Sequence, residues 1–385
     1  MFLRRLLSSI LVFSLVLFIL SAMAWGEEQT LKKVRVGITP YAFSMMFPVI
    51  HETGIDHEVG VDFDLVDFPS SANTFQILIR GDVDMLNEDM SVHIAKLKNS
   101  PEVRTFGTNN LFKGFILIGR KGSDKSYEEV LADKGNPDEA KKFILNSLKG
   151  RKFVAAPFFA GVISDALQQV GLKLEDIEYV QFADDQKAAS AFISGVGDFY
   201  LGSLPQEIKM LSMPDKFINM GGNTEIMGPA SLFYGGILTT EKYLKENNDV
   251  ILRVMAAFYR GAKYLQDAVK NNDVHNIYIQ LMKEELNKRT AGTMPDEDMF
   301  NTEKKYEEIF TYERAWEVSL NPQSKLYWKI TGDYQMKVEV GLGHLDQEYD
   351  LTHYFLWEKT YADLTQRKDL MDFINQPLTP LSRKK

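Results

Sequence analysis

The sequence contains the same pattern twice, 114 positions apart. Residues 79–85 (IRGDVDM) match residues 193–199 (ISGVGDF) at an Ile, a Gly and an Asp, and Val66 matches Val180 at the same offset. A repeat constrains the architecture more than any single motif does. Two copies of about 60 residues are too few and too long for a solenoid. The repeat therefore predicts two similar lobes that face each other across a cleft.

Each copy alternates strand-like and helix-like segments. In the first copy we expect strands at 33–38, 61–68 and 84–86, and helices that end near 53 and cover 73–79 and 90–98. In the second copy we expect strands at 152–156, 177–182 and 199–201, and helices at 162–170, at 186–193 and from 205. This alternation predicts βαβ units and a mainly parallel sheet in each lobe. The shared Gly-x-x-Asp is typical of a structural turn, in which Gly ends a helix and Asp orders the next residues.

Two apolar runs, 112–119 and 232–238, connect the copies and are interpreted as crossover strands between the lobes. Gly235 and Gly236 permit unusual backbone dihedrals at the second crossing. The predicted division is a leader at 1–24, lobe one at 31–116 plus 237–385, and lobe two at 117–236. The insertion 125–149 is predicted to be a solvated surface helix. From residue 241 onward we expect helices, including 243–270, 278–286 and 303–316, that pack on lobe one.

Composition excludes several classes of protein. The net charge of −9 disfavours nucleic acid, whose binding depends on basic patches. The chain has no cysteine, which excludes disulfides, thiol nucleophiles and cysteine metal sites. The six histidines are scattered without metal-ligand spacing, and His51 and His57 are expected to be exposed near a helix end.

The N-terminal segment has the pattern of a secretory signal peptide. Arg4 and Arg5 precede an apolar run at 6–20, and the segment 22–24 (AMA) supplies small residues before a cleavage site. We predict cleavage after Ala24; an uncleaved membrane anchor is the alternative.

In open parallel sheets, ligands bind outside the carboxyl ends of the strands. The repeat thus nominates three loops in each lobe: 39–44, 68–73 and 87–91 in lobe one, and 157–161, 182–187 and 201–205 in lobe two. These loops are rich in aromatic and acidic residues, which favours a neutral or nitrogen-bearing, cationic ligand over an oxyanion. The ligand-binding candidates are Thr39, Tyr41, Phe43, Ser70, Asn73, Asn87, Glu88, Asp89, Phe158, Phe159, Gly161, Asp184, Ser203 and Tyr234.

Structural explanations remain open for several of these candidates. The aromatic residues would equally cover the interface between the lobes, and Asp89, Asp184 and Ser203 would equally cap helices. The sequence has no nucleophile, phosphate-binding or metalloprotease motif. We therefore expect no catalytic residue, no metal and no cofactor.

The order of these motifs resembles a known family. The segments 36–40 (VGITP), 81–84 (GDVD) and 148–154 (LKGRKFV), followed by the second Gly-x-x-Asp, are similar to substrate-binding proteins of bacterial ABC importers. The group covers nitrate, sulfonate, taurine and thiamin-pyrimidine precursors and is called NMT1/THI5-like. The resemblance spans about residues 33–270 and implies an α/β, two-lobed type II periplasmic-binding-protein fold. In that fold, two similar parallel-sheet lobes are joined by crossover strands; here a helical C-terminal extension follows.

The resemblance implies an extracytoplasmic receptor that closes on a small organic ligand and delivers it to an ABC permease in the inner membrane. We expect a periplasmic monomer that is not an enzyme. The insertion at 125–149 and the long C-terminus exceed the family's usual plan, and a cytoplasmic branch that makes the thiamin pyrimidine relies on cysteines that this chain lacks. The alternatives are an exported enzyme with Glu88 or Asp89 as acid or base, and a sensory or interaction module of the same fold.

Overall fold

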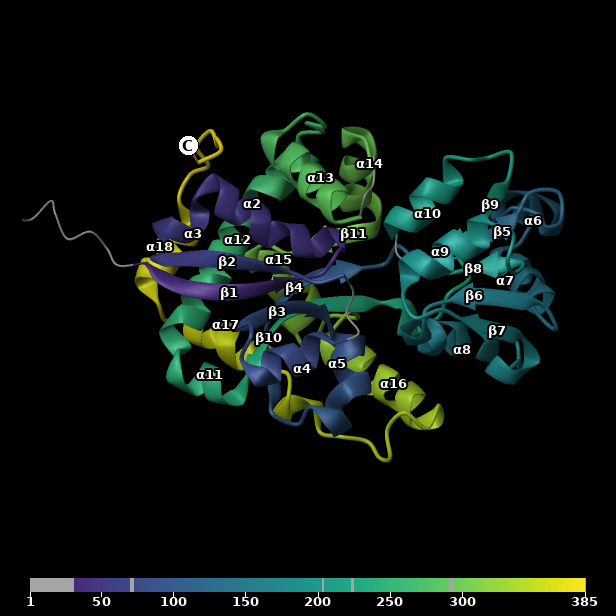
Figure 1. Cartoon of the computed structure of the whole chain (residues 1–385), viewed down its shortest axis with the longest axis horizontal. Coiled ribbons are helices and arrows are strands. Elements are labelled where there is room, and N and C mark those ends of the chain that lie inside the picture. The colour runs from purple at the N-terminus through teal and green to yellow at the C-terminus, as the bar shows by residue number, and fades with distance from the viewer. Residues whose placement is uncertain (1–30, 70–72, 203, 223–224, 291–293, 385) are drawn as a thin grey trace, which may run out of the picture.

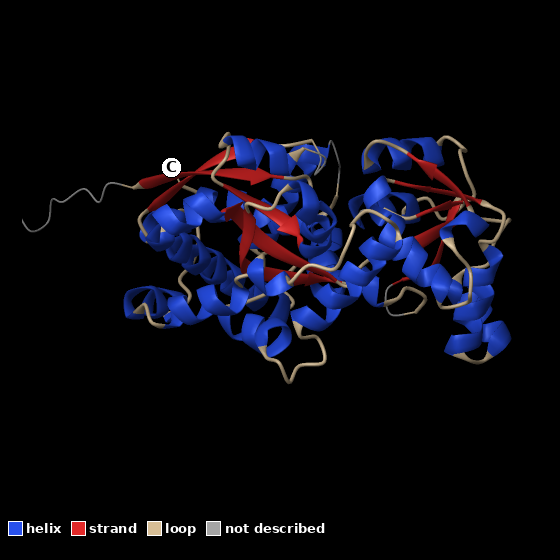
Figure 2. Ribbon diagram, turned by 90° about the horizontal axis from the view of Figure 1, so that it is seen from below, coloured by secondary structure: helices blue, strands red, loops and turns tan. Residues whose placement is uncertain are grey.

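The two sequence copies fold into two α/β lobes, each built around its own twisted sheet (Figures 1 and 2). This computed structural model describes residues 31–69, 73–202, 204–222, 225–290 and 294–384. The predicted signal peptide lies outside the described residues. Within them, no helix is both long and apolar enough to cross a membrane.

The sheet of lobe one has six strands in the order β2-β1-β3-β10-β4-β11. The strands are β1 (Lys32–Ile38), β2 (Val61–Asp67), β3 (Met85–Asp89), β4 (Val103–Phe112), β10 (Phe233–Thr240) and β11 (Glu307–Ile309). β1 runs parallel to β2 and β3, whereas β10 runs antiparallel to β3 and β4.

The sheet of lobe two repeats this arrangement in the order β7-β6-β8-β5-β9. Its strands are β5 (Ile116–Arg120), β6 (Lys152–Ala155), β7 (Glu178–Gln181), β8 (Phe199–Tyr200) and β9 (Phe217–Gly222). β6 is parallel to β7 and β8, while β5 is antiparallel to β8 and β9. The two-lobed α/β fold is confirmed. Each sheet is mixed rather than parallel throughout, because the strand that returns from the other lobe enters antiparallel to its neighbours.

The Gly-x-x-Asp turns have the same conformation and the same hydrogen bond in both lobes. Gly81 and Gly195 adopt left-handed backbone conformations, with φ of 78° and 103°. Asp84 accepts a hydrogen bond from the backbone N–H of Arg35 at 2.8 Å, and Asp198 accepts one from the N–H of Lys152 at 2.9 Å. Asp84 thus ties the turn before β3 to β1, and Asp198 ties the turn before β8 to β6.

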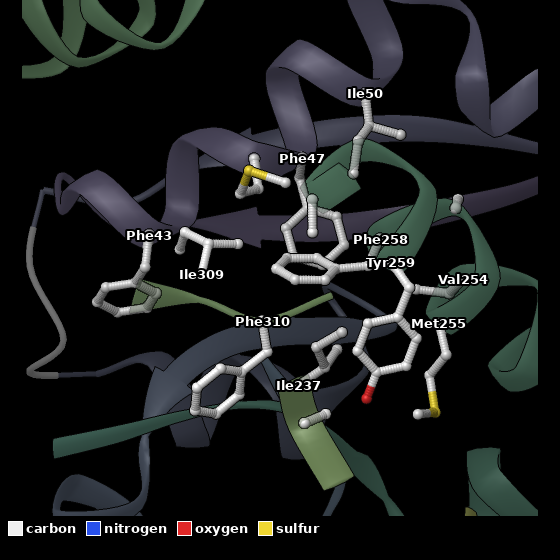
Figure 3. Close-up of a cluster of buried hydrophobic side chains, with 14 of the residues drawn as sticks. Phe43, Phe47, Ile50, Ile237, Val254, Met255, Phe258, Tyr259, Ile309 and Phe310 are labelled. Atoms are coloured by element: carbon white, nitrogen blue, oxygen red, sulfur yellow. The ribbon is translucent and has the colours of Figure 1, made fainter. Parts of the chain in front are cut away.

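Helices cover both faces of the lobe one sheet (Figure 1). The helices that follow β1 are η1 (Ala42–Met45), α2 (Met46–Thr53) and α3 (Ile55–Glu58). Helix α4 (Thr74–Arg80) follows β2, and α5 (Met90–Lys96) and η2 (Leu97–Asn99) follow β3. The long helix α12 (Asn248–Lys270) packs with α2 on one face, where Phe47, Phe258 and Tyr259 lie in the main core (Figure 3). A smaller core with Phe75 and Leu238 lies under α4 and α5 on the other face.

The helices of lobe two enclose its sheet in the same way. They are α6 (Tyr127–Lys134), α7 (Pro137–Ser147), η3 (Pro157–Phe159), α8 (Ala160–Gln168), η4 (Leu174–Asp176), α9 (Asp185–Ile193) and α10 (Leu204–Leu211). The predicted single surface helix at 125–149 is wrong. The segment forms two capped helices, and Val130, Ile144 and Leu145 bury one side of the pair in the core of lobe two.

The C-terminal region returns to lobe one and adds to it. Its elements are η5 (Pro229–Ser231), α11 (Glu241–Glu246), α12, α13 (Ile277–Thr290), α14 (Asp296–Asn301), the π-helical turns η6 (Thr302–Tyr306) and η7 (Ala315–Leu320), α15 (Tyr312–Arg314), α16 (Trp328–Gly341), η8 (Leu351–His353), α17 (Trp357–Thr365) and α18 (Lys368–Asn375). The prediction of a helix at 303–316 is wrong, because Glu307–Ile309 forms the edge strand β11, which pairs with β4. Helix α16 packs on α5 of lobe one and also on α8 of lobe two.

Two strand-to-strand passages connect the lobes. One runs from β4 to β5, and the other leads through η5 into β10, which lies in the sheet of lobe one along its whole length. Gly235 and Gly236 are not among the residues with positive φ, so the predicted dihedral role is wrong. They are needed for space, since a Cβ on Gly235 would lie 1.7 Å from Oδ1 of Asn110.

Candidate functional site

A cavity of about 530 Å³, measured with the space open to solvent, lies at the junction of the two lobes. Of this space, about 50 Å³ is available to the centres of water-sized molecules, so the cavity is narrow in this arrangement of the lobes. Its lining residues are Tyr41, Ala42, Phe43, Glu88, Asp89, Val92, Phe112, Phe115, Phe159, Leu204, Pro205, Phe233 and Glu307. They come from strand ends and helix beginnings in both lobes, as the topology of an open sheet predicts.

Six of the lining side chains are aromatic, and four of them contact one another at the junction. Phe115, in the first passage between the lobes, packs edge-on against Phe112 and Phe233 with ring centroids 4.8 Å apart. Phe159 of lobe two meets Phe115 at 5.5 Å. Such T-shaped pairs are a favourable aromatic geometry. They join the two lobes through one aromatic cluster.

Tyr41 and Phe43 form the aromatic wall that lobe one contributes. Their rings stack with centroids 5.9 Å apart and an interplanar angle of 11°. Phe43 is buried at the margin of the main core, near Ile309 (Figure 3), and Tyr41 is half-buried. The two rings therefore have a packing role as well as a surface that faces the cavity.

Three carboxyl groups, all from lobe one, line the same cavity: Glu88 and Asp89 at the end of β3, and Glu307 at the start of β11. Oε1 of Glu307 accepts a hydrogen bond from Asn110 at 2.8 Å. Burial, together with the nearby Glu88 and Glu307, raises the pKa of Asp89 well above its ordinary value. Burial also raises the pKa of Glu307 well above its ordinary value.

The charge around these carboxyl groups is distributed unevenly. Burial lowers the pKa of Lys96, at the end of α5, and the nearby Glu88 partly offsets this effect. For Asp89, burial and both neighbouring carboxyl groups raise the pKa, and no cation in the described part of the chain lowers it. Its Oδ1 is buried and has no hydrogen-bond partner among the described residues. A positively charged group in the cavity would therefore stabilise the ionised form of Asp89 most directly.

Five of the sequence-predicted residues lie around this cavity: Tyr41, Phe43, Glu88, Asp89 and Phe159. Asn87–Asp89 belong to β3 itself and not to a loop, because the strand continues for three residues beyond its predicted end. Asn87 lies behind the cavity, where its amide donates to the carbonyl of Phe43 at 3.2 Å and accepts from Asn109. Asn87 thus positions the aromatic wall.

Other predicted residues lie elsewhere. Thr39 is buried and shares a hydrogen bond with Ser44 at 2.8 Å. Tyr234 is a core residue whose hydroxyl donates to the carbonyl of Leu326, because its side chain leaves β10 on the buried face. Asn73 is exposed at the start of α4. These three side chains are absent from the lining of the cavity.

The remaining predictions divide between capping and a second, smaller cavity. Asp184 caps α9 by accepting a hydrogen bond from the N–H of Lys187 at 2.8 Å, whereas Asp89 makes no such side-chain cap to α5. Gly161 lines a small cavity against α16. Ser70, Ser203 and the side chain of Phe158 lie outside the described residues.

The sequence reasoning missed several lining residues, namely Val92, Phe112, Phe115, Leu204, Pro205, Phe233 and Glu307. Phe112, Phe115 and Phe233 lie in or beside the predicted crossover runs, so treating those runs as part of the cleft would have found them. No local signal identifies Glu307, because it reaches the site only when β11 pairs with β4.

The comparisons with known proteins agree with this architecture. Residues 134–269 match the family described as NMT1/THI5 like. No curated protein matches the sequence. The structure is similar to the periplasmic aliphatic sulphonate binding protein SsuA of Escherichia coli, with 15% identity, coverage of 84% of this chain and 91% of that chain, and a TM-score of 0.61.

Two further solved structures show the same fold. The periplasmic nitrate-binding protein NrtA of Synechocystis PCC 6803 has 11% identity, coverage of 92% of this chain and 94% of that chain, and a TM-score of 0.58. The Candida albicans CA3427 gene product, described as having the generic periplasmic binding protein fold, has 16% identity, coverage of 84% and 96%, and a TM-score of 0.57. The chain therefore has a periplasmic-binding-protein fold, and the resemblance inferred from its motifs is confirmed.

Proposed function

We propose that this chain is the extracytoplasmic solute-binding receptor of an ABC importer and that its ligand is a small nitrogen-bearing cation. The observation that carries the proposal is the cavity between the lobes, where six aromatic rings and three carboxyl groups line one space. None of the described lining residues is basic. Aromatic faces and carboxylates both attract ammonium groups, and both repel sulfonate and nitrate.

The two walls would hold different parts of the ligand. The carboxyl groups all belong to lobe one, whereas lobe two contributes the apolar Phe159, Leu204 and Pro205. A ligand with one cationic end and one apolar or aromatic end matches this asymmetry. Closure about the two interlobe passages would bury it, as in other hinge-bending receptors.

The buried carboxyl groups also predict how binding depends on pH. Without a ligand, the raised pKa of Asp89 means that its carboxyl group retains its proton to a higher pH than an exposed Asp would. A permanently charged cation binds the ionised form better, so its affinity should increase with pH across the titration of this group. A quaternary ammonium probe keeps its own charge constant and isolates this effect.

The proposed partner is an ABC permease in the inner membrane, with the receptor a monomer in the periplasm. The resemblance to the NMT1/THI5-like group and the periplasmic neighbours support this placement. The predicted cleavage after Ala24 is part of the same proposal. Sequencing the N-terminus of the exported chain would test it.

A thermal-shift and calorimetry panel tests the ligand class. We expect tetramethylammonium, choline and aminopyrimidines to raise the Tm, and methanesulfonate, taurine and nitrate to leave it unchanged, since only a ligand of the folded state stabilises it. Stabilisation by the oxyanions alone would contradict the proposal.

Tyr41→Ala should weaken binding of the best cation, and Phe143→Ala is its matched control because Phe143 is an exposed aromatic on α7. Chemical conversion of the bound compound, followed by mass spectrometry, would favour the enzyme alternative.

A further inference from the structure

A cluster of two histidines and two aspartates lies at the end of lobe one that is remote from the cavity. His51 is in the last turn of α2, Asp56 and His57 are in α3, and Asp62 is at the start of β2. Figure 1 places α3 at the end of lobe one that points away from lobe two, beside the C-terminus. The short connection through Gly54, in a left-handed conformation with φ of 81°, folds the two helices so that the histidines meet. Both histidines are half-buried rather than fully exposed, and their spacing along the chain did not predict that they would meet.

One potential ligand atom from each side chain lies within 4.8 Å of the other three. His51 Nδ1 is 2.7 Å from Oδ2 of Asp56 and 3.8 Å from Oδ1 of Asp62. His57 Nε2 is 2.8 Å from the same Asp62 oxygen. The ligand atoms of a tetrahedral zinc site are about 3.3 Å apart, given Zn–N and Zn–O distances near 2.0 Å. The observed separations bracket that value, so small side-chain rotations suffice to reach it.

The cluster is anchored on one side and adjustable on the other. The side chain of Asp56 is fully buried, and its oxygens accept the backbone N–H groups of His57 at 2.9 Å and Phe63 at 3.1 Å. Such hydrogen bonds fix the orientation of a ligating carboxylate. The side chains of His51, His57 and Asp62 are 32%, 37% and 36% exposed, which leaves a route for an ion to enter.

We propose that His51, Asp56, His57 and Asp62 bind one divalent transition-metal ion, with Zn²⁺ as the best match. Two imidazole nitrogens and two carboxylate oxygens suit Zn²⁺, Co²⁺ or Ni²⁺, whereas Mg²⁺ and Ca²⁺ prefer oxygen ligands alone. Two separate His–Asp hydrogen bonds would explain the short distances. They leave unexplained why the same nitrogen of His51 also approaches Asp62, an arrangement that a shared cation satisfies.

The C-terminal segment adds a contact that should oppose the ion. Nζ of Lys384 lies 3.2 Å from Oδ1 of Asp56. The backbone N–H of Lys384 donates to the carbonyl of Glu52 at 2.7 Å. A metal ion on Asp56 would be close to this ammonium group. Removing the charge with Lys384→Ala should therefore strengthen metal binding, by roughly threefold to tenfold.

The test uses the full chain after treatment with a chelator and dialysis. We expect Zn²⁺ to bind in calorimetry with one equivalent per chain, and Co²⁺ to give the visible absorption of a tetrahedral complex. Mg²⁺ should not compete. His57→Gln and Asp62→Asn should each weaken binding by more than about tenfold while circular dichroism without metal stays unchanged.

His344→Gln is the matched control, because Nδ1 of His344 lies 2.7 Å from a Glu339 carboxylate in a second histidine–carboxylate pair. It should bind Zn²⁺ as the unaltered chain does. Absence of a one-to-one complex, or equal loss in His344→Gln, would overturn the proposal. So would unchanged affinity in His57→Gln and Asp62→Asn. Asp89→Asn should keep the metal, which makes failure here distinguishable from failure of the receptor proposal.

Discussion

In lobe one the third strand ends with Asn87, Glu88 and Asp89 and brings acidic groups to the cavity. In lobe two the equivalent strand, β8, ends at Tyr200, whose hydroxyl donates to Asp185 at 2.6 Å. A Cβ on the following Gly202 would lie 1.8 Å from that hydroxyl oxygen. Thus Tyr200 and Asp185 of lobe two bond to each other, whereas Glu88 and Asp89 of lobe one line the space between the lobes.

This contrast shows which positions of a duplicated fold can differ between the copies. The glycine and aspartate of each Gly-x-x-Asp turn occupy equivalent positions and make equivalent hydrogen bonds, because both lobes need them to fold. The residues at the end of the third strand and directly after it have no such duty in the repeat. Lobe one uses them for acidic groups and lobe two for internal packing, which gives the cavity two chemically different walls.

The largest expected effect concerns the strands that link the lobes. Gly235→Ala in β10 should lower the free energy of unfolding by about 3 kcal/mol, because the new methyl group would overlap the short side chain of Asn110. Gly119→Ala in β5 should cost only about 1 kcal/mol, since its methyl group would meet the flexible thioether of Met220. Urea unfolding of the full chain measures both, and equal losses would contradict this comparison of the passages.

The second prediction tests the shared turns. Asp84→Ala should cost about 2 kcal/mol, because Asp84 accepts from the backbone of Arg35 and also pairs with its guanidinium group at 2.5 Å. Asp198→Ala should cost about 1 kcal/mol, since the Asp198 side chain is 39% exposed and lies 3.6 Å from its Arg partner. A larger loss in Asp198→Ala would show that lobe two depends more on its turn.

The third prediction concerns the two acidic positions that sequence reasoning treated alike. Asp89→Asn should weaken binding of a quaternary ammonium ligand by about tenfold and reduce its pH dependence, because one of the two cavity carboxyl groups with a strongly raised pKa is lost while Glu307 remains. Asp184→Asn should leave the affinity unchanged, since Asp184 caps α9 and Asn is also a good cap. Calorimetry between pH 6 and pH 9 measures both variants. An equal loss of affinity in both would place the ligand somewhere other than this cavity.

The last prediction concerns the pH dependence of stability. Burial raises the pKa of Glu303, in lobe one, to about 8. The folded chain therefore retains a proton that the unfolded chain releases near pH 4.3, so the free energy of unfolding falls as the pH rises from about 4.3 to about 8. Glu303→Gln should remove much of this loss, because the amide has no proton to release.

Glu207 of lobe two provides the contrast to Glu303. It is also buried with a raised pKa, but its Oε1 accepts the backbone N–H groups of Ile116 and Gly202 at 3.2 Å. Glu207→Ala should therefore be destabilising at pH 5 as well as at pH 8. Thermal unfolding across this range measures both variants. A stabilising Glu207→Ala would contradict the role of its hydrogen bonds.

Local sequence patterns were enough to predict the two lobes, three strands of each repeat copy, and the aromatic and acidic character of the cleft. These features follow from local patterns: the repeat, the β-branched runs, and the glycines that end helices. Tyr41, Phe43, Glu88, Asp89 and Phe159 were found because a parallel sheet brings its strand ends together.

Which polar residues share a site depends on how distant elements pack together. Glu307 reaches the cavity because β11 pairs with β4, a partner almost 200 residues away in the sequence. Asp184 was assigned to the cleft by position, yet its side chain is used by its own helix. His51, Asp56, His57 and Asp62 meet because two short helices fold back at Gly54 onto the start of β2, and spacing along the chain did not reveal that the four would converge. Local patterns fix which elements form, whereas the pairing and packing of distant elements fix the distances between side chains.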